Sequence, residues 1–179
     1  MYGFDRNSDS ICSQRVPVDY WWISGGAVNG EGAIDAILDL VEQLLAGWDW
    51  TDYALEEELG YLAELLERAG RGHLEPLTEI KPIQRKFFYR MFEIRHQVSV
   101  VRTTRLMGKV VDRRESAEYV RIYHAEGGTL PASHALAAHV HLKQITPDDT
   151  RTRELQNTQI DRAVEVLSAG ASNHWGIPR

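Results

Sequence analysis

Apolar side chains recur at helical spacing in two stretches of the first half of the chain. In residues 33–46 and 53–69, polar and acidic positions separate apolar ones with a period of about 3.6 residues, which gathers the apolar ones on one face. These apolar positions are Ile34, Ile37, Leu38, Val41, Leu44 and Leu45, then Leu55, Leu59, Leu62 and Leu66. Gly47 and Gly70 follow the two stretches and are typical helix ends. The pattern predicts two amphipathic, antiparallel helices.

After Pro76 the period changes from helical to alternating, which is typical of strands. An aromatic and β-branched run near the amino terminus is also typical of a strand, because such side chains pack well on a pleated surface. The predicted strands are residues 18–24, 87–95, 118–125 and 135–143. Residues 96–117 either extend two of these strands as hairpin arms or form a mobile basic loop, and the sequence favours neither.

The end of the chain carries the signals of one more helix. Thr146 is a candidate N-cap, Pro147 suits the first helical position, and Gly170 follows the last apolar turn. The order strand, helix, helix, three strands, helix predicts one α+β domain with a mostly antiparallel sheet and a C-terminal helix. We expect the helices of residues 33–46 and 53–69 to pack on one face of the sheet and the other face to stay open.

The alternation predicts that this open face is polar. Tyr119, Arg121 and Tyr123 point to one side of their strand, opposite Val120, Ile122 and His124, because successive side chains alternate between faces. The neighbouring strands add further polar residues to the same surface, namely Glu93, Arg95, His139, His141 and Lys143. Strict alternation also assigns Ala135 and Ala137 to this face and Leu136, Ala138, Val140 and Leu142 to the buried one.

Composition narrows the class of protein. With 179 residues and 43% hydrophobic content, the chain can bury one sizeable core. Cys12 is the single cysteine, so an intrachain disulfide and a cysteine cluster for a metal are both excluded. His139 and His141 would suit zinc, but no third ligand occurs at a convincing spacing, so neither metal nor cofactor is predicted. No secretion signal or long apolar run occurs, so we expect a cytoplasmic protein with no membrane partner.

The net charge of -6 hides an uneven distribution. Residues 1–80 hold sixteen acidic and four basic side chains, whereas residues 81–125 hold eleven basic and four acidic ones. A basic middle of the chain, net +7 against net -12 before it, indicates a localised anion-binding site. The alternative is that the two parts neutralise each other across the fold.

Several of these segments together resemble one protein family. "YRMFEIR", "YVRIYH", "ALAAHVHLKQITP" and "ELQNTQIDRAVEVL" are similar to the sheet and last helix of the RelE/ParE superfamily of bacterial toxins, in its phage-derived HigB-like branch. The resemblance covers residues 18–170, which leaves 1–17 as an N-terminal extension and 171–179 as a tail. It implies a RelE/ParE-like fold and a small cytoplasmic endoribonuclease that cleaves mRNA, usually on the ribosome, and is inhibited by a cognate antitoxin.

The resemblance and the chemistry of RNA cleavage assign roles to the polar residues. Metal-independent cleavage needs a base for the ribose 2′-OH, an acid for the leaving oxygen and cations for the phosphorane. The resemblance matches Arg121, Tyr123, Arg95 and Lys143 to the family's catalytic motifs, and His139 and His141 are natural proton carriers. Further basic residues are expected to hold the RNA backbone, namely Lys81, Arg85, Lys86, Arg102 and Arg105.

Other interpretations stay open at this point. Arg95 could pair with Glu93 or a helix carboxylate, and His139 and His141 could be partly buried sheet residues. The chain could also be a ParE-like inhibitor of a topoisomerase, a phage-derived inhibitor of another host protein, or a binding module for an acidic partner. Histidines that point into the core would favour these binding functions over the nuclease.

Overall fold

The fold combines one mixed sheet with helices on both of its faces. The computed structural model describes residues 9–24, 27–48, 50, 52–98, 101–106, 109–114 and 118–177. Within these residues, six strands form the sheet in the order β2 (Ala27–Asn29), β1 (Asp19–Ser24), β8 (His134–Leu142), β7 (Glu118–Glu126), β4 (Arg90–Val98) and β3 (Ile80–Ile83). Neighbouring strands are antiparallel except β1 and β8, which are parallel. The expected α+β class and predominantly antiparallel pairing are confirmed.

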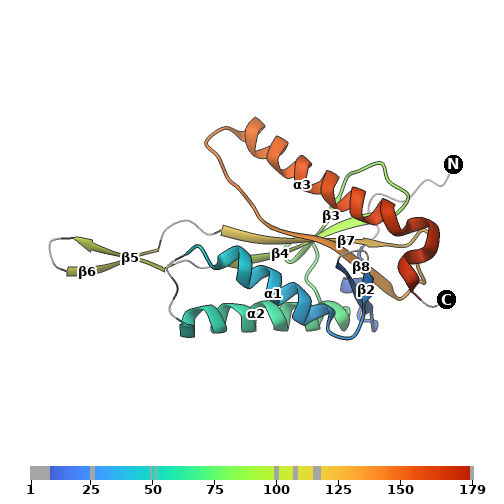
Figure 1. Ribbon diagram of the computed structural model, residues 1–179, viewed down its shortest axis with the longest axis horizontal. Coiled ribbons are helices and arrows are strands. Elements are labelled where there is room, and N and C mark those ends of the chain that lie inside the picture. The colour runs from blue at the N-terminus through green and yellow to red at the C-terminus, as the bar shows by residue number, and fades with distance from the viewer. Residues whose placement is uncertain are drawn as a thin grey trace.

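The two predicted amphipathic helices cover one face of the sheet. They are α1 (Ala33–Leu45) and α2 (Asp52–Gly70), and Figure 1 shows them side by side below the strands. Their apolar stripes enter one core cluster with inward-facing residues of β1, β4, β7 and β8. Ile37 and Leu66 from the helices and Ile122 from β7 are fully buried in this cluster. Helical periodicity therefore located both helices and the face that they bury.

The expectation of an open second face is wrong. Helix α3 (Asp149–Gly170) and the 3-10 helix η2 (Ala171–Gly176) lie on that face (Figure 1). Ile160, Ala163 and Leu167 pack there against Tyr123 and Leu136 of the sheet. This second core exists because the C-terminal helix carries its own apolar stripe and has to bury it against something.

Helix α3 also begins two residues later than predicted. Asp148 is its N-cap, and its side-chain oxygen accepts hydrogen bonds from the backbone N–H groups of Thr150 and Arg151 at 2.8 and 3.3 Å. The hydroxyl of Thr146, the expected cap, instead donates to the carbonyl of Asp148 at 2.7 Å. A carboxylate at the positive end of the helix caps it more effectively than the more distant threonine hydroxyl.

The described residues between β4 and β7 form two paired strands. β5 (Val101–Leu106) pairs with β6 (Lys109–Arg114) in a separate two-stranded sheet that extends β4 and β7 away from the body (Figure 1). Of the two possibilities for residues 96–117, the described segments therefore adopt the extended arms. Among the described helices, none is long and apolar enough to cross a lipid bilayer.

Segments outside the predicted toxin domain join the same cores. The 3-10 helix η1 (Ile11–Ser13) places Ile11 and Cys12 in the cluster under α1 and α2, and Trp175 of η2 lies in the cluster under α3. The carbonyl of Cys12 accepts a hydrogen bond from the N–H of Leu74 at 2.8 Å, which attaches η1 to the segment after α2. The domain boundaries at residues 17 and 170 stay predictions.

Candidate functional site

Polar residues from four strands meet beneath the first half of α3. Directly opposed residues of adjacent strands share a face, so the register defines two cross-strand rows. These rows are Lys81, Glu93, Tyr123 and His139, then Arg95, Arg121 and His141. Alternation predicted this grouping for all of these residues except Lys81, which was expected only as an RNA-backbone contact.

A β-bulge changes the alternation along β8. Tyr123 is opposite His139, but the next residue of β7 is already opposite Ala137, so Ala138 is the extra residue. As a result Ala135 and Ala137 pack in the core under α1 and α2, while Leu136 lies under α3. The faces predicted for these alanines and for Leu136 and Ala138 are therefore wrong, because one inserted residue exchanges the two sides.

Arg121 is buried and does not face solvent as expected. Its relative exposure is 1%, and its Nη1 donates a 2.8 Å hydrogen bond to Oε1 of Glu93, which is itself 3% exposed. Burial lowers the pKa of the Arg121 guanidinium, and the nearby charge of Arg95 acts in the same direction, although Glu93 opposes both. The reason for the difference is α3, which covers the face that was expected to be open.

Positive charge exceeds negative charge around Glu93. Arg95 Nε lies 3.6 Å from Oε1 of Glu93, so the expected pairing of these two residues occurs, and Arg95 also donates to the carbonyl of Leu77 at 3.0 Å. Burial, with the charges of Arg121 and Arg95 adding to it, lowers the pKa of Lys143. Among the described residues, the Nε–H groups of Arg95 and Arg121 lack a hydrogen-bond acceptor. Such a cluster attracts an anion.

His139 has one ring nitrogen engaged by α3. Its Nε2 lies 2.7 Å from Oε1 of Gln159, and Arg162 donates to the same oxygen at 3.2 Å. Because a guanidinium only donates, the atom at that position is the amide oxygen, and His139 must donate to it from Nε2. Nδ1 of the neutral ring then carries no proton, and its lone pair is available as an acceptor. Burial lowers the pKa of His139, which keeps this ring neutral near pH 7.

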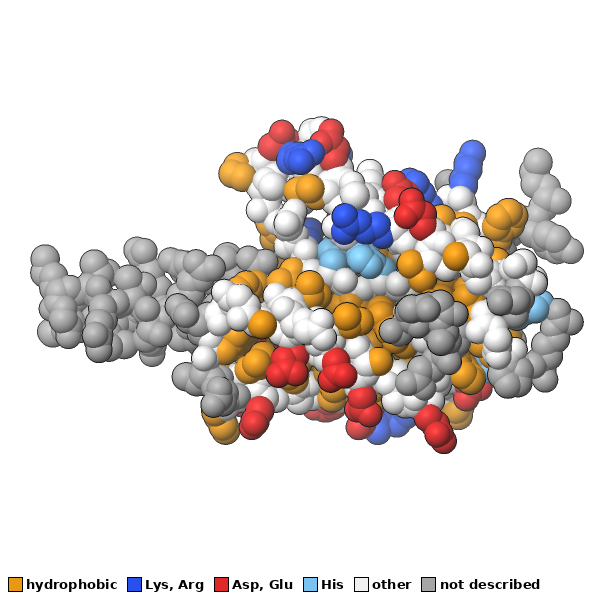
Figure 2. Space-filling view, in the orientation of Figure 1, with side chains coloured by type: hydrophobic (Ala, Val, Ile, Leu, Met, Phe, Trp, Pro, Cys, Tyr) orange, Lys and Arg blue, Asp and Glu red, His pale blue; other side chains and the backbone are white. Residues whose placement is uncertain are grey.

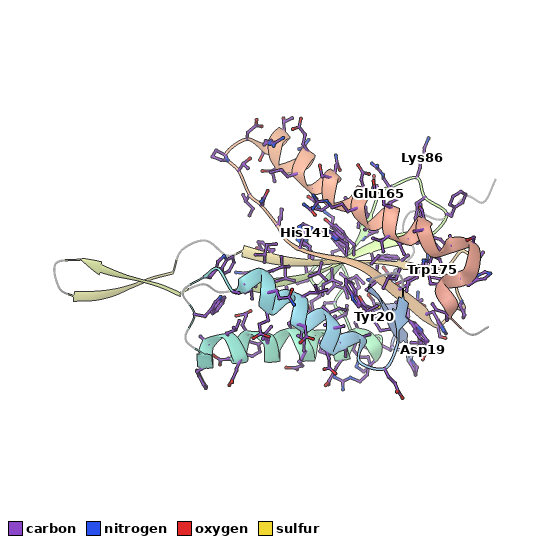
Figure 3. All side chains as sticks on the ribbon, in the orientation of Figure 1. Asp19, Tyr20, Lys86, His141, Glu165 and Trp175 are labelled. Carbon is purple, nitrogen blue, oxygen red and sulfur yellow. The ribbon has the colours of Figure 1, made fainter. Side chains whose placement is uncertain are left out.

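His141 is neutral and has both ring nitrogens engaged. Its Nδ1 lies 3.0 Å from the carbonyl of Leu142, which can only accept, so Nδ1 carries the proton and Nε2 accepts the Tyr123 hydroxyl at 3.0 Å. Burial lowers the pKa of His141 to about 4. The ring stacks on His139 with centroids 5.7 Å apart. Figure 3 shows His141 on the side of the sheet that faces α3.

The site opens to solvent through a shallow hollow between the end of β8 and α3. Its lining residues are His141, Leu142, Lys143, Gln144, Leu155, Gln156 and Gln159. Histidine side chains reach the surface here next to basic ones (Figure 2). Of the lining residues, His141 is 7% exposed and Lys143 is half-buried. His139 is also half-buried and lies next to the lining, stacked on His141.

The expected RNA-binding residues separate into three groups. Lys81 is exposed and lies opposite Glu93, within the cross-strand rows. Arg85 pairs with Asp161 of α3, and Lys86 is exposed in the loop before β4, away from His141 (Figure 3). Arg102 and Arg105 belong to β5, but their side chains lie outside the described residues.

Three residues of the site were not predicted to act in it. Glu93 organises the cations, Gln156 donates to its Oε2 at 3.3 Å, and Gln159 orients His139. Glu93 could have been identified, because it shares its strand face with Arg95. The glutamines could not, because nothing in the periodicity showed that α3 covers this face.

Comparison of the chain with models of known protein families gave no match. Searches of curated proteins and of solved structures also gave none. The RelE/ParE resemblance therefore stays a prediction.

Proposed function

We propose that the chain is an endoribonuclease toxin of the RelE/ParE type that cleaves mRNA in the cytoplasm, on the ribosome. One observation carries the proposal. An excess of positive charge over the Glu93 carboxylate lies on the same sheet face as the neutral His139, whose Nδ1 carries no proton. Phosphodiester cleavage without a catalytic metal needs this combination of cations and base.

In the proposed reaction His139 is the base and Lys143 the acid. Nδ1 of His139 takes the proton of a ribose 2′-OH, the 2′ oxygen bonds to the adjacent phosphorus, and the bond from phosphorus to the 5′ oxygen breaks. The Lys143 ammonium gives that oxygen a proton, and its lowered pKa makes it a stronger acid than an ordinary lysine. The products are a 2′,3′-cyclic phosphate and a 5′-hydroxyl end.

Arg121 contributes from beneath the site. Its Nη1 is occupied by Glu93, so it acts as a positioning residue that fixes the carboxylate between itself and Arg95. Arg95 and Lys143 are more exposed and supply the charge that meets the phosphorane. Tyr123 is also a positioning residue, because it is fully buried and its hydroxyl donates a hydrogen bond to His141.

The proposal includes a cognate antitoxin. A nuclease that cleaves cellular mRNA harms its host unless a partner blocks it. Lys143 in the lining of the hollow and Arg95 on the neighbouring strands fit an acidic segment of such a partner, which would exclude the RNA phosphate from both.

A second function is favoured by the burial of the innermost residues. Arg121, Tyr123 and His141 are 1%, 0% and 7% exposed, which suits a structural network under α3. The chain would then be a phage-derived or ParE-like inhibitor that binds a host protein, such as a topoisomerase, and does not cleave RNA.

Brief induced expression followed by mapping of the 5′ ends of cellular RNA distinguishes the two functions. The nuclease predicts growth arrest with new 5′-hydroxyl ends for the wild type, and loss of both for His139→Ala and Lys143→Ala. Arg153→Ala is the matched control, because Arg153 is an exposed residue of α3. Arrest without new RNA ends would reject the nuclease in favour of the inhibitor, and full cleavage by His139→Ala would reject the assigned base.

A further inference from the structure

A second buried polar cluster lies on the other face of the sheet. His124 and Glu126 are alternate residues near the end of β7 and point into the α1 and α2 side, where Cys12 of η1 meets them. All three residues are 0% exposed. One ligand-type atom from each, the Cys12 sulfur, a His124 nitrogen and a Glu126 oxygen, lies within 4.8 Å of the other two.

Several donors hold the carboxylate of this cluster in place. Glu126 accepts hydrogen bonds from the Ser10 hydroxyl and from the Ile11 N–H, the latter at 3.0 Å. Arg90 approaches the same carboxylate with an N–O distance of 3.5 Å. A carboxylate, a thiol and an imidazole thus converge out of contact with solvent, and these are the side-chain groups that bind transition metals.

The imidazole is oriented so that one nitrogen faces the cluster. Nε2 of His124 lies 2.9 Å from Oε1 of Glu126, while Nδ1 lies 3.5 Å from the Tyr20 hydroxyl. The ring also stacks on Phe92 with centroids 5.7 Å apart. Metal-binding histidines are held in this way, with the second nitrogen on a polar partner that fixes the ring.

We propose that Cys12, His124 and Glu126 bind a divalent transition metal, with zinc as the ion that fits best. Thiolate, imidazole and carboxylate are the three ligand types that zinc accepts, whereas calcium and magnesium prefer oxygen ligands alone. Atoms around one tetrahedral zinc lie roughly 3 to 4 Å apart, so only a small inward movement is required. The buried Ser10 hydroxyl, which hydrogen-bonds to the Glu126 carboxylate, lies beside the cluster and would supply the fourth ligand.

The metal would attach η1 to the sheet. Cys12 belongs to a segment more than a hundred positions before His124 in the sequence, and a shared ion would crosslink the two as a disulfide does. On binding, the Cys12 thiol releases its proton to solvent and the sulfur becomes a thiolate ligand. Because the cluster is closed to solvent, the ion has a structural role and is separate from the proposed RNA site on the opposite face.

Metal analysis of the full chain tests the proposal. Protein incubated with zinc and then desalted should retain about one equivalent of zinc per chain, as a closed structural site does. Cobalt in its place should give a thiolate charge-transfer band in the near ultraviolet. Cys12→Ser should lose the band and most of the zinc, and a strong chelator should lower the melting temperature of the wild type but not of Cys12→Ser.

Two comparisons keep the test decisive. His73→Gln is the matched control, because His73 is exposed, and it should keep the zinc and the chelator effect. The cobalt spectrum of the wild type needs no variant, so poor folding of Cys12→Ser leaves the test intact. Wild-type protein that retains no zinc, a cobalt spectrum without the thiolate band, or a folded Cys12→Ser that holds as much zinc as the wild type would each overturn the proposal.

Discussion

Arg121 and Glu93, from adjacent strands of the sheet, form an ion pair of 2.8 Å that α3 covers almost completely. The two residues are diagonal neighbours on β4 and β7: Glu93 is directly opposite Tyr123, and Arg121 is directly opposite Arg95. Removing two charges from water is costly, so the pair contributes little net stability, while either charge alone would be strongly destabilising. Because both residues belong to the candidate site, losing either one should affect the stability of the fold as well as the site.

Replacing Arg121 should destabilise the fold as well as reduce RNA cleavage. Arg121→Ala leaves the buried Glu93 with only its longer contacts to Arg95 and Gln156, and breaking a buried ion pair costs up to about 3 to 5 kcal/mol in the free energy of unfolding. Arg121→Lys should recover part of this stability, because it restores the charge but not the planar contact. Urea unfolding of the purified variants measures the effect.

The double variant Arg121→Met, Glu93→Gln separates the two contributions. It removes both charges, so its free energy of unfolding should lie much closer to that of the wild type than to that of Arg121→Ala. If Arg121→Ala alone were as stable as the wild type, the pair would not be buried as described.

The stability of the chain should fall between pH 6.5 and pH 4 because of His141. Its pKa in the folded protein is about 4, below the ordinary value of about 6.5, so in this window the unfolded chain binds a proton that the folded chain does not. The full difference corresponds to about 3 kcal/mol at most, present above pH 6.5 and lost as the pH falls to 4.

His141→Gln is the matched variant for this pH dependence. Glutamine can still accept the Tyr123 hydroxyl but does not titrate, so the loss of stability across the window should be smaller than in the wild type. Urea unfolding at several pH values makes the comparison. An unchanged profile in His141→Gln would assign the titration to other groups.

The N-cap of α3 should be Asp148 in solution. Asp148→Ala removes the acceptor for the N–H groups of Thr150 and Arg151 and should lower the free energy of unfolding by about 1 kcal/mol. Asp148→Asn keeps an acceptor oxygen and should lose much less. Thermal unfolding of the two variants is the measurement, and equal losses would show that the charge at the helix end, not the hydrogen bond, matters.

Periodicity was sufficient for most elements and for the grouping of the site. Both helices that cover the first face, and the three long strands of the sheet, lie where the apolar patterns predicted them. Alternation also placed Arg95, Arg121 and His141 on one face, because a strand of regular pleat has only two sides. The positions of these helices and strands and the faces of their residues depend on local sequence, so the spacing of apolar residues is enough to predict them.

The remaining features depend on contacts between distant segments. The bulge at Ala138 has no signal in the sequence, because residues on both faces of this Ala-rich strand are apolar. The position of α3 over Arg121 follows from tertiary packing of its stripe, not from its own sequence period. Cys12 meets His124 through folding alone, so a ligand search by spacing along the chain could not find the pair.

RNA affinity should depend on Lys81 more than on Lys86. Lys81 lies opposite Glu93 in the cross-strand rows, whereas Lys86 is in a loop away from His141. A lysine that contacts a backbone phosphate releases counterions on binding, so Lys81→Ala should weaken binding to all sequences alike and reduce the slope of log affinity against log salt by about 0.7 for single-stranded RNA. Lys86→Ala, with the same change of charge, should leave the slope unaltered.

Fluorescence anisotropy at several salt concentrations, in a His139→Ala background that does not cleave the RNA, makes the measurement. A slope that falls with Lys86→Ala but not with Lys81→Ala would place the RNA path over the loop before β4 instead of the cross-strand rows.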